Sequence, residues 1–194
     1  MRLRSLKWIA AAACALPLAS QADGFSYRYV DLAHLPDADV DADNLDVNGD
    51  GLQVRGSLPV YQNFFVTAEL LSMDLDNGAD VTRLAVGGGG HWPVNPTVDF
   101  IARGGFVNYD VEIGNFDDDD TGLFLSGRLR TTIMPKLELE GGIEYYNVEV
   151  AGLDDDTYFI GEGRYNITPQ LSAGVLFTIG GDTDLFGVQG RLNF

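Results

Sequence analysis

A period of two runs through the sequence from Gly24 to Phe194: apolar or small residues occupy every second position, and polar residues lie between them. Because successive side chains of a β-strand point to opposite faces, this period predicts strands with one apolar face each, and no stretch shows a helical period. Ten strands are predicted, each close to the length that a tilted strand needs to cross a bilayer. They cover residues 24–33, 51–60, 63–73, 81–92, 97–109, 121–132, 137–149, 157–166, 171–180 and 185–194.

The charged residues in the middle of these strands all fall on the face opposite the apolar residues. They are Arg28, Arg55, Glu69, Arg83, Asp99, Arg103, Arg128, Arg130, Glu138, Glu140, Glu144, Glu162, Arg164 and Arg191. The planar guanidinium of arginine pairs with two carboxylates, so arginine is favoured in a confined ion network, whereas a solvated surface also uses lysine freely. After the first 22 residues the only lysine is Lys136, in a predicted turn. The pattern therefore predicts ion pairs inside a closed barrel.

Two closed barrels fit this alternation: a membrane barrel with its apolar face outward, and a soluble periplasmic binder with its apolar face inward. Aromatic residues near the ends of the apolar face favour the membrane barrel, because aromatic girdles mark the two membrane interfaces. They are Phe25, Phe64, Phe106, Tyr145, Phe159, Tyr165, Phe186 and Phe194. The predicted fold class is all-β: an up-and-down antiparallel transmembrane β-barrel of ten strands, with the soluble barrel as the alternative.

The predicted connections alternate between two kinds. Short turns contain prolines, which lack the N–H that a strand ladder needs. The other connections are longer and acidic, at 36–50, 74–80, 112–120, 151–156 and 181–184. Outer-membrane barrels have tight periplasmic turns and longer outer loops, so the prediction places the acidic loops outside and both termini on the periplasmic side.

The first 22 residues are predicted to be a cleaved secretory signal peptide. A basic start with Arg2, Arg4 and Lys7 precedes a short apolar stretch, and Ser20 and Ala22 are the small residues that cleavage before Asp23 needs. The apolar stretch is too short to span a bilayer. We expect one domain from residue 23 to residue 194, without a lipid on Cys14, which lies inside the signal.

The remaining chain is strongly acidic. Without Arg2, Arg4 and Lys7, nine of the 12 basic residues stand against 29 acidic residues, for a net charge near −20. Nucleic acid is not expected as a partner, because its phosphates need basic residues.

The last predicted strand ends in an aromatic residue, with Phe186, Val188, Leu192 and Phe194 on one face. This resembles the terminal strand that the outer-membrane assembly machinery recognises. Together with the signal, the strands and the connections, residues 23–194 resemble the small OmpA/OmpX-type outer-membrane barrels of Gram-negative bacteria. The resemblance implies a monomer at the bacterial outer membrane, in contact with lipid and lipopolysaccharide. That group has eight strands, so eight strands are an alternative to ten, and no peptidoglycan-binding domain is expected.

One acidic segment suggests a cation site. Asp46, Asn48 and Asp50 match the first half of a calcium loop, but an EF-hand would need a glutamate where Ser57 stands. A partial site for Ca²⁺ or Mg²⁺ is predicted there, and no other cofactor is expected. The acidic loops are also predicted to share divalent cations with lipopolysaccharide phosphates.

No catalytic residues are predicted. His34 with Asp31 and Asp37 is the one candidate rim site, and His91 is expected near the short-turn end. Nucleophile elbows and phosphate-binding loops are absent from the sequence. The predicted function is a non-enzymatic role in envelope structure or surface interaction, with a porin-like narrow channel as the alternative.

Overall fold

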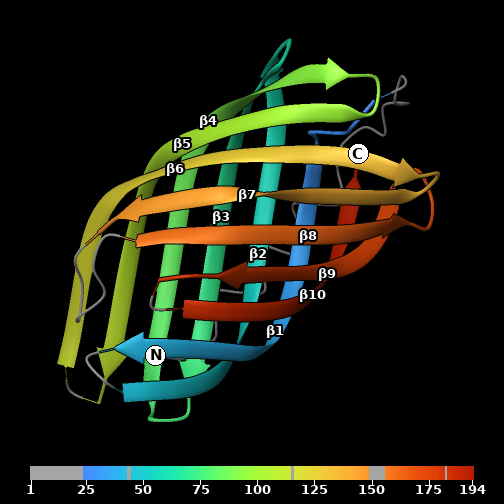
Figure 1. Cartoon of the computed structure of the whole chain (residues 1–194). Coiled ribbons are helices and arrows are strands. Elements are labelled where there is room, and N and C mark those ends of the chain that lie inside the picture. Colours follow the sequence, from blue (N-terminus) through green and yellow to red (C-terminus); the bar gives the residue numbers. More distant parts are fainter. Residues whose placement is uncertain (1–23, 43–44, 115, 149–155, 182) are drawn as a thin grey trace.

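The computed structural model describes residues 24–42, 45–114, 116–148, 156–181 and 183–194; the side chains of residues 40–46 and 116 lie outside the description as well. In this part of the chain, ten strands form one sheet (Figure 1). They are β1 (Tyr29–Ala42), β2 (Leu45–Tyr61), β3 (Phe64–Leu75), β4 (Ala79–Asn95), β5 (Val98–Ile113), β6 (Phe116–Met134), β7 (Leu137–Asn147), β8 (Asp156–Asn166), β9 (Leu171–Ile179) and β10 (Thr183–Asn193). No helix among the described residues is long and apolar enough to cross a bilayer.

The sheet closes on itself. Each strand pairs antiparallel with its sequence neighbours, and β1 pairs with both β2 and β10. Closure gives every strand two partners, so no edge is left to pair with another chain. The predicted fold class, an up-and-down antiparallel barrel of ten strands, is confirmed.

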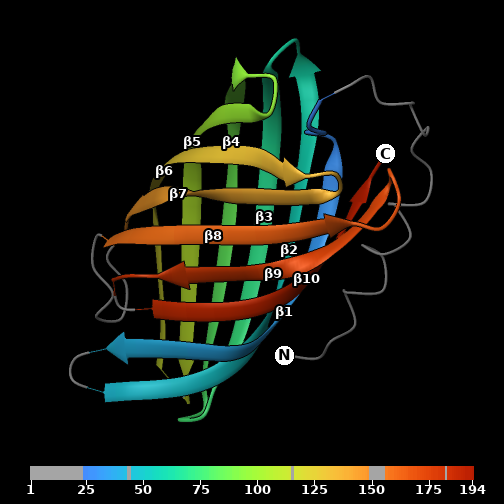
Figure 2. The same cartoon turned by 45° about the vertical axis from the view of Figure 1, so that its right-hand side comes forward.

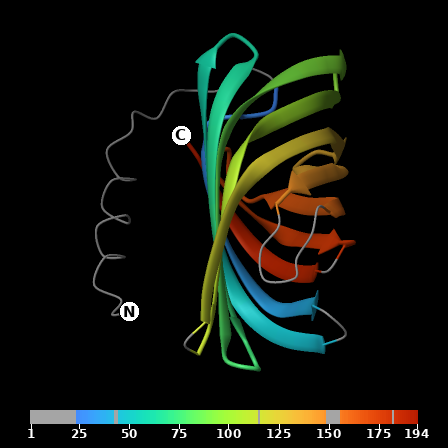
Figure 3. The ribbon, with the colours of Figure 1, turned by 90° about the vertical axis from the view of Figure 1, so that its left-hand side faces the viewer.

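The two walls of the barrel cross at a steep angle, with β7 to β10 in front of β2 to β4 (Figures 1 and 2). Strands β5 and β6 bend from one wall into the other, as Figures 1 and 3 show. Glycines permit the close approach of β4 and β5 at this bend. Gly87 lies opposite Gly105, and a Cβ added at Gly87 would lie 2.3 Å from the carbonyl oxygen of Gly104. Any larger residue would push the two strands apart.

Several strands are longer than predicted. The predicted loop at 36–50 is mostly strand, because β1 and β2 stay paired up to Ala42 and Leu45 after a bulge between Leu35 and Ala38. The predicted loop at 112–120 is likewise a tight hairpin of β5 and β6. These predictions were wrong because acidic residues were taken as loop residues, whereas an exposed strand face also accepts charge.

The apolar face changes sides along these long strands. In the half of β5 near its short turn, Phe100 and Phe106 point outward and Arg103 points inward. Beyond Phe106 the outward residues are polar, and the inward residues Val107 and Val111 are apolar and buried. The same inversion occurs in β2, β3 and β4, whereas on β6 the inward residues beyond Leu123 are Gly122, Asp120 and Asp118, which are only partly buried. The half of the barrel near the short turns is therefore apolar outside and charged inside, and on β2 to β5 the other half is the reverse.

The face assignment of the first strand also differs from the prediction. Tyr27, Tyr29 and Asp31 are buried, whereas Arg28 precedes β1 and is only partly buried. The predicted strand 24–33 had placed Arg28 on the inner face. Phe25 had been assigned to the outward apolar face, and this assignment reversed the two faces of the strand.

Candidate functional site

The interior of the half near the short turns is a network of charged side chains. Within the described residues it contains equal numbers of arginines and carboxylates, seven of each. They are Arg55, Arg83, Arg103, Arg128, Arg130, Arg164 and Arg191 with Asp31, Glu69, Asp99, Glu138, Glu140, Glu144 and Glu162. All the predicted network residues except Arg28 lie here, and Asp31 is the addition. With Asp31 in place of Arg28, the network has no net charge. A set of buried charges that is not balanced in this way carries a large desolvation penalty.

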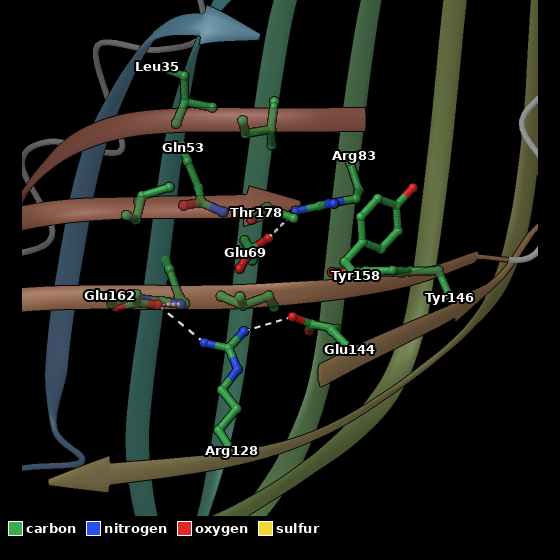
Figure 4. A pocket seen from close by; sticks show the side chains of 14 residues that line it. Leu35, Gln53, Glu69, Arg83, Arg128, Glu144, Tyr146, Tyr158, Glu162 and Thr178 are labelled. Atoms are coloured by element: carbon green, nitrogen blue, oxygen red, sulfur yellow. Dashed lines mark hydrogen bonds and ion pairs between the residues drawn. The ribbon is translucent and has the colours of Figure 1, made fainter. Parts of the chain in front are cut away.

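Glu162 on β8 is the most connected carboxylate of the network. Arg55 donates to it across the barrel at 2.8 Å, and Arg128 donates at 3.2 Å. Arg164 on the same strand and Gln189 on β10 donate to it as well. Figure 4 shows the guanidinium of Arg128 between Glu162 and Glu144. The side chain of Glu162 is 2% exposed, so its negative charge is compensated by these donors and by Arg191, 4.0 Å away.

Asp31 on β1 forms ion pairs with both neighbouring strands at the place where the barrel closes. It accepts from Arg55 on β2 at 2.8 Å and from Arg191 on β10 at 2.6 Å. The ring of Tyr29 stacks on the guanidinium of Arg191, 3.7 Å from its centroid. Sequence reasoning missed Asp31. The signal that could have found it is its register position between two inward-facing arginines.

The first residues of the described chain lie across the short-turn end of the interior. The Tyr27 hydroxyl donates to Asp99 at 2.8 Å, and His91 contacts the same carboxylate at 3.2 Å. The rings of Tyr27 and His91 stack with centroids 3.8 Å apart. Arg130 donates to the carbonyl of Ser26 at 2.9 Å. Hydrogen bonds and stacked rings thus hold this segment in the barrel mouth, and His91 lies at the short-turn end, where it was predicted.

The other half of the interior is an apolar core. It begins above the ion pair of Arg83 and Glu69, which are 2.6 Å apart and lie among the rings of Tyr109, Tyr146 and Tyr158. Beyond it, buried aliphatic and aromatic residues from the described parts of eight strands pack together. They include Leu35, Val47, Leu71, Met73, Leu75, Val81, Val107, Val111, Phe124, Leu176 and Leu185. Sequence reasoning did not predict this core.

The space left in the middle of the barrel is small, and a larger hollow of about 290 Å³ lies at the short-turn mouth beside Arg130 and Glu138. Two cavities line up beside Arg83, and each holds about 30 Å³. Since roughly 10–15 Å³ of such space holds one water molecule, each cavity has room for only a few waters. Figure 4 shows Arg83, Glu69 and Tyr158 among the side chains that line the first of them. Beyond the short-turn mouth the described interior is filled: by ion pairs in one half and by apolar side chains in the other.

The outer surface divides at the level where the apolar face changes sides. Large apolar residues cover the half nearer the short turns, which we call the apolar band. Examples are Leu52, Leu84 and Leu125, which are 51%, 45% and 63% exposed. Aromatic residues on this band include Phe64, Phe106, Tyr145, Phe159, Tyr165 and Phe186, as predicted for a girdle. Phe25 and Phe194 depart from that prediction, because Phe25 packs on Arg130 and Phe194 is buried.

Above the apolar band, carboxylates from five adjacent strands form a row, which we call the acidic collar. Cross-strand pairing places Asp50 opposite Asp74, Asp74 opposite Asp80, Asp80 opposite Glu112, and Glu112 opposite Asp117. All five side chains are exposed. A hydrogen bond with Asp80 raises the pKa of the Asp74 carboxyl, which shows how close these groups are. Like charges directly opposite each other destabilise a sheet.

A sequence comparison places these features in a family. Residues 8–163 match the family described as "Outer membrane protein beta-barrel domain". The chain belongs to this family. A search of curated proteins found none that matches the chain.

Solved structures agree with the fold of an outer-membrane barrel. The chain is similar to the translocator domain of the autotransporter NalP from Neisseria meningitidis, with a TM-score of 0.54 at 9% identity over 98% of this chain and 94% of that one. It is also similar to an outer-membrane channel from Pseudomonas putida F1, with a TM-score of 0.54 at 9% identity over 90% of this chain and 100% of that one. At such low identity the likeness concerns the fold.

As an outer-membrane barrel, the protein crosses the bacterial outer membrane with its apolar band in the lipid. Outer-membrane barrels keep their short turns in the periplasm, so the turns after β2, β4, β6 and β8 mark the periplasmic end. The acidic collar and the apolar core then lie at the outer end. The predicted signal at residues 1–22 lies outside the described residues.

The two remaining predicted sites are not assembled as the sequence suggested. Asn48 and Asp50 lie on β2 and not in a calcium loop, and the side chain of Asp46 lies outside the description. A strand spaces alternate residues about 6.8 Å apart, so they do not converge as loop ligands do. Among the described residues no group of three His, Cys, Asp or Glu side chains is placed to hold a metal. His34 is exposed, whereas Asp31 points inward, so these two residues do not form a rim pair.

Proposed function

We propose that this outer-membrane barrel has a non-enzymatic role in envelope structure and surface interaction, as the small OmpA/OmpX-type barrels do. The observation that carries the proposal is the filled interior. A solute would have to separate a neutral network of buried ion pairs and then pass an apolar core, and breaking a buried pair costs about 3–5 kcal/mol. The outer surface is then the part of the molecule that is available for interaction.

The acidic collar is the surface that we propose for this interaction. Its carboxylates lie directly opposite one another on neighbouring strands and just above the apolar band, which would put them at the level of the lipopolysaccharide phosphates. Two anionic surfaces at this level repel each other unless cations lie between them. Ca²⁺ and Mg²⁺ prefer carboxylate and phosphate oxygens, so they would bridge the collar to lipopolysaccharide.

The proposal also covers export of the chain and its assembly in the outer membrane. Residues 1–22 would direct the chain through the inner membrane and be removed, and β10 with Phe194 would be read by the assembly machinery. Monomeric insertion is consistent with a sheet that closes without a second chain.

Protease accessibility of the collar tests the proposed interaction. The protein is inserted into vesicles that contain lipopolysaccharide, and cleavage at the outer end is timed with Ca²⁺ and with EDTA. We expect Ca²⁺ to slow cleavage several-fold in the native protein. The variant D74N/D80N/E112Q should lose this effect, whereas D76N, which removes one carboxylate in the adjacent turn, should keep it. Equal cleavage of the native protein with Ca²⁺ and EDTA would count against the proposal.

A further inference from the structure

A groove of about 580 Å³ runs over the lipid-facing side of β5, β6 and β7. Two neighbouring glycines, Gly104 and Gly105, form its floor. Its walls include Phe106, Leu125 and Tyr145, which are 67%, 63% and 38% exposed. The groove is many times larger than either cavity of the interior, and its lining is almost entirely apolar.

The groove exists because the two glycines, Gly104 and Gly105, carry no side chains that would thicken the barrel wall at this place. Gly105 faces inward, where a Cβ would lie 2.3 Å from the carbonyl oxygen of Val86 and 2.8 Å from the ring of Phe124. The Phe124 ring, which is 3% exposed, therefore closes the floor from the inside. Gly104 faces outward without a side chain between its neighbours. The hollow thus opens toward lipid and is closed toward the interior.

The ends of the apolar band show how deep the groove lies in the membrane. On β5, Phe106 is the last outward apolar residue before Asn108 and Asp110. On β6, Leu123 is the last one before Thr121. The side chain of Asn108 donates to the hydroxyl of Thr121 at 3.1 Å, so a polar pair borders the groove on its outer side. The groove therefore lies in the outer leaflet, directly below the polar boundary.

We propose that the groove binds one acyl chain of a lipopolysaccharide molecule. The groove is continuous with the surface that faces lipid, so an acyl chain reaches it without leaving the membrane. An apolar hollow in this position gains contact with every methylene that enters it, whereas a protein partner would have to be buried in the leaflet. The outer leaflet supplies lipopolysaccharide, whose sugar headgroup would meet the Asn108 and Thr121 pair.

Acyl-chain binding in the groove requires neither the acidic collar nor its cations. An experiment can therefore contradict the groove proposal and leave the collar proposal standing, or the reverse. The collar acts on headgroup phosphates and requires divalent cations. The groove acts on an acyl chain and should hold it in the presence of EDTA.

Native mass spectrometry of the folded barrel tests the groove. The protein is refolded in detergent with purified lipid A, in EDTA, and the fraction that carries one lipid A is measured. We expect L125A, which lowers one wall, to reduce this fraction at least three-fold. The control L129A truncates an equally outward leucine of the same strand, 52% exposed and outside the groove, and should leave the fraction unchanged.

A second pair of variants fills the groove without removing a contact. A Cβ at Gly104 would meet the flexible Leu125 side chain at 3.0 Å, so G104L should occupy the groove and displace lipid A. G56L adds the same side chain to β2, where nothing lies within 4 Å, and should not displace it. If L125A and G104L retain as much lipid A as their controls, the groove is not the binding site. Equal retention of a phosphatidylethanolamine by the native barrel would overturn the assignment to lipopolysaccharide.

Discussion

Replacing Glu162 with glutamine should be the most destabilising neutralisation of a single charge in this barrel. The side chain accepts hydrogen bonds from Arg55, Arg128, Arg164 and Gln189. E162Q removes one negative charge from a network in which buried charges balance, and three guanidinium groups lose their common partner.

The size of the effect follows from the burial of these groups. Removal of one partner from a buried ion pair destabilises a protein by about 3–5 kcal/mol. Neutralisation of an exposed carboxylate changes stability by less than about 0.5 kcal/mol. With a urea dependence of roughly 2 kcal/mol per molar, E162Q should lower the unfolding midpoint by about 1.5–2.5 M.

The assay is urea unfolding of the barrel in detergent micelles, followed by tryptophan fluorescence and by the different gel mobility of folded and unfolded barrels. D74N, which neutralises an exposed collar residue, serves as the control and should unfold like the native protein. The double variant E162Q/R164Q restores neutrality and should recover part of the loss. A midpoint for E162Q within 0.3 M of the native value would refute the view that the network is buried and interdependent.

Two further outcomes test the sealed interior and the bend in the sheet. In planar bilayers the native barrel should show no stable unitary conductance; regular current steps that change with R103A or E140A would instead establish the narrow channel. G87A should prevent folding, because its Cβ would lie 2.3 Å from a backbone oxygen of β5, whereas G56A, with open space around it, should fold normally and give a heat-modifiable band. Normal folding of G87A would show that β4 and β5 can separate at the bend.

The register of the first strand shows what one strand cannot determine alone. In residues 24–33, tyrosines alternate with valine, leucine and arginine, and either face can be taken as apolar. Cross-strand pairing decides, because Asp31 lies directly opposite both Arg55 and Arg191. The opposite register would have buried Arg28 without a carboxylate and exposed Asp31 to lipid.

The sequence by itself determined the alternation, the number of strands, the closed barrel and the segregation of arginines and carboxylates on one face. These follow from a period of two, which is a local property of the chain. The ends of the strands, the apolar core and the groove were decided by the tertiary structure. At Phe106 and at the matching positions of neighbouring strands, the surroundings of the outer face change from lipid to water. The apolar residues therefore move from the outside to the inside while the strands continue. In the sequence of one strand, this change of face looks like the end of the strand. Only the cross-strand pairing with its neighbours shows that the strand continues.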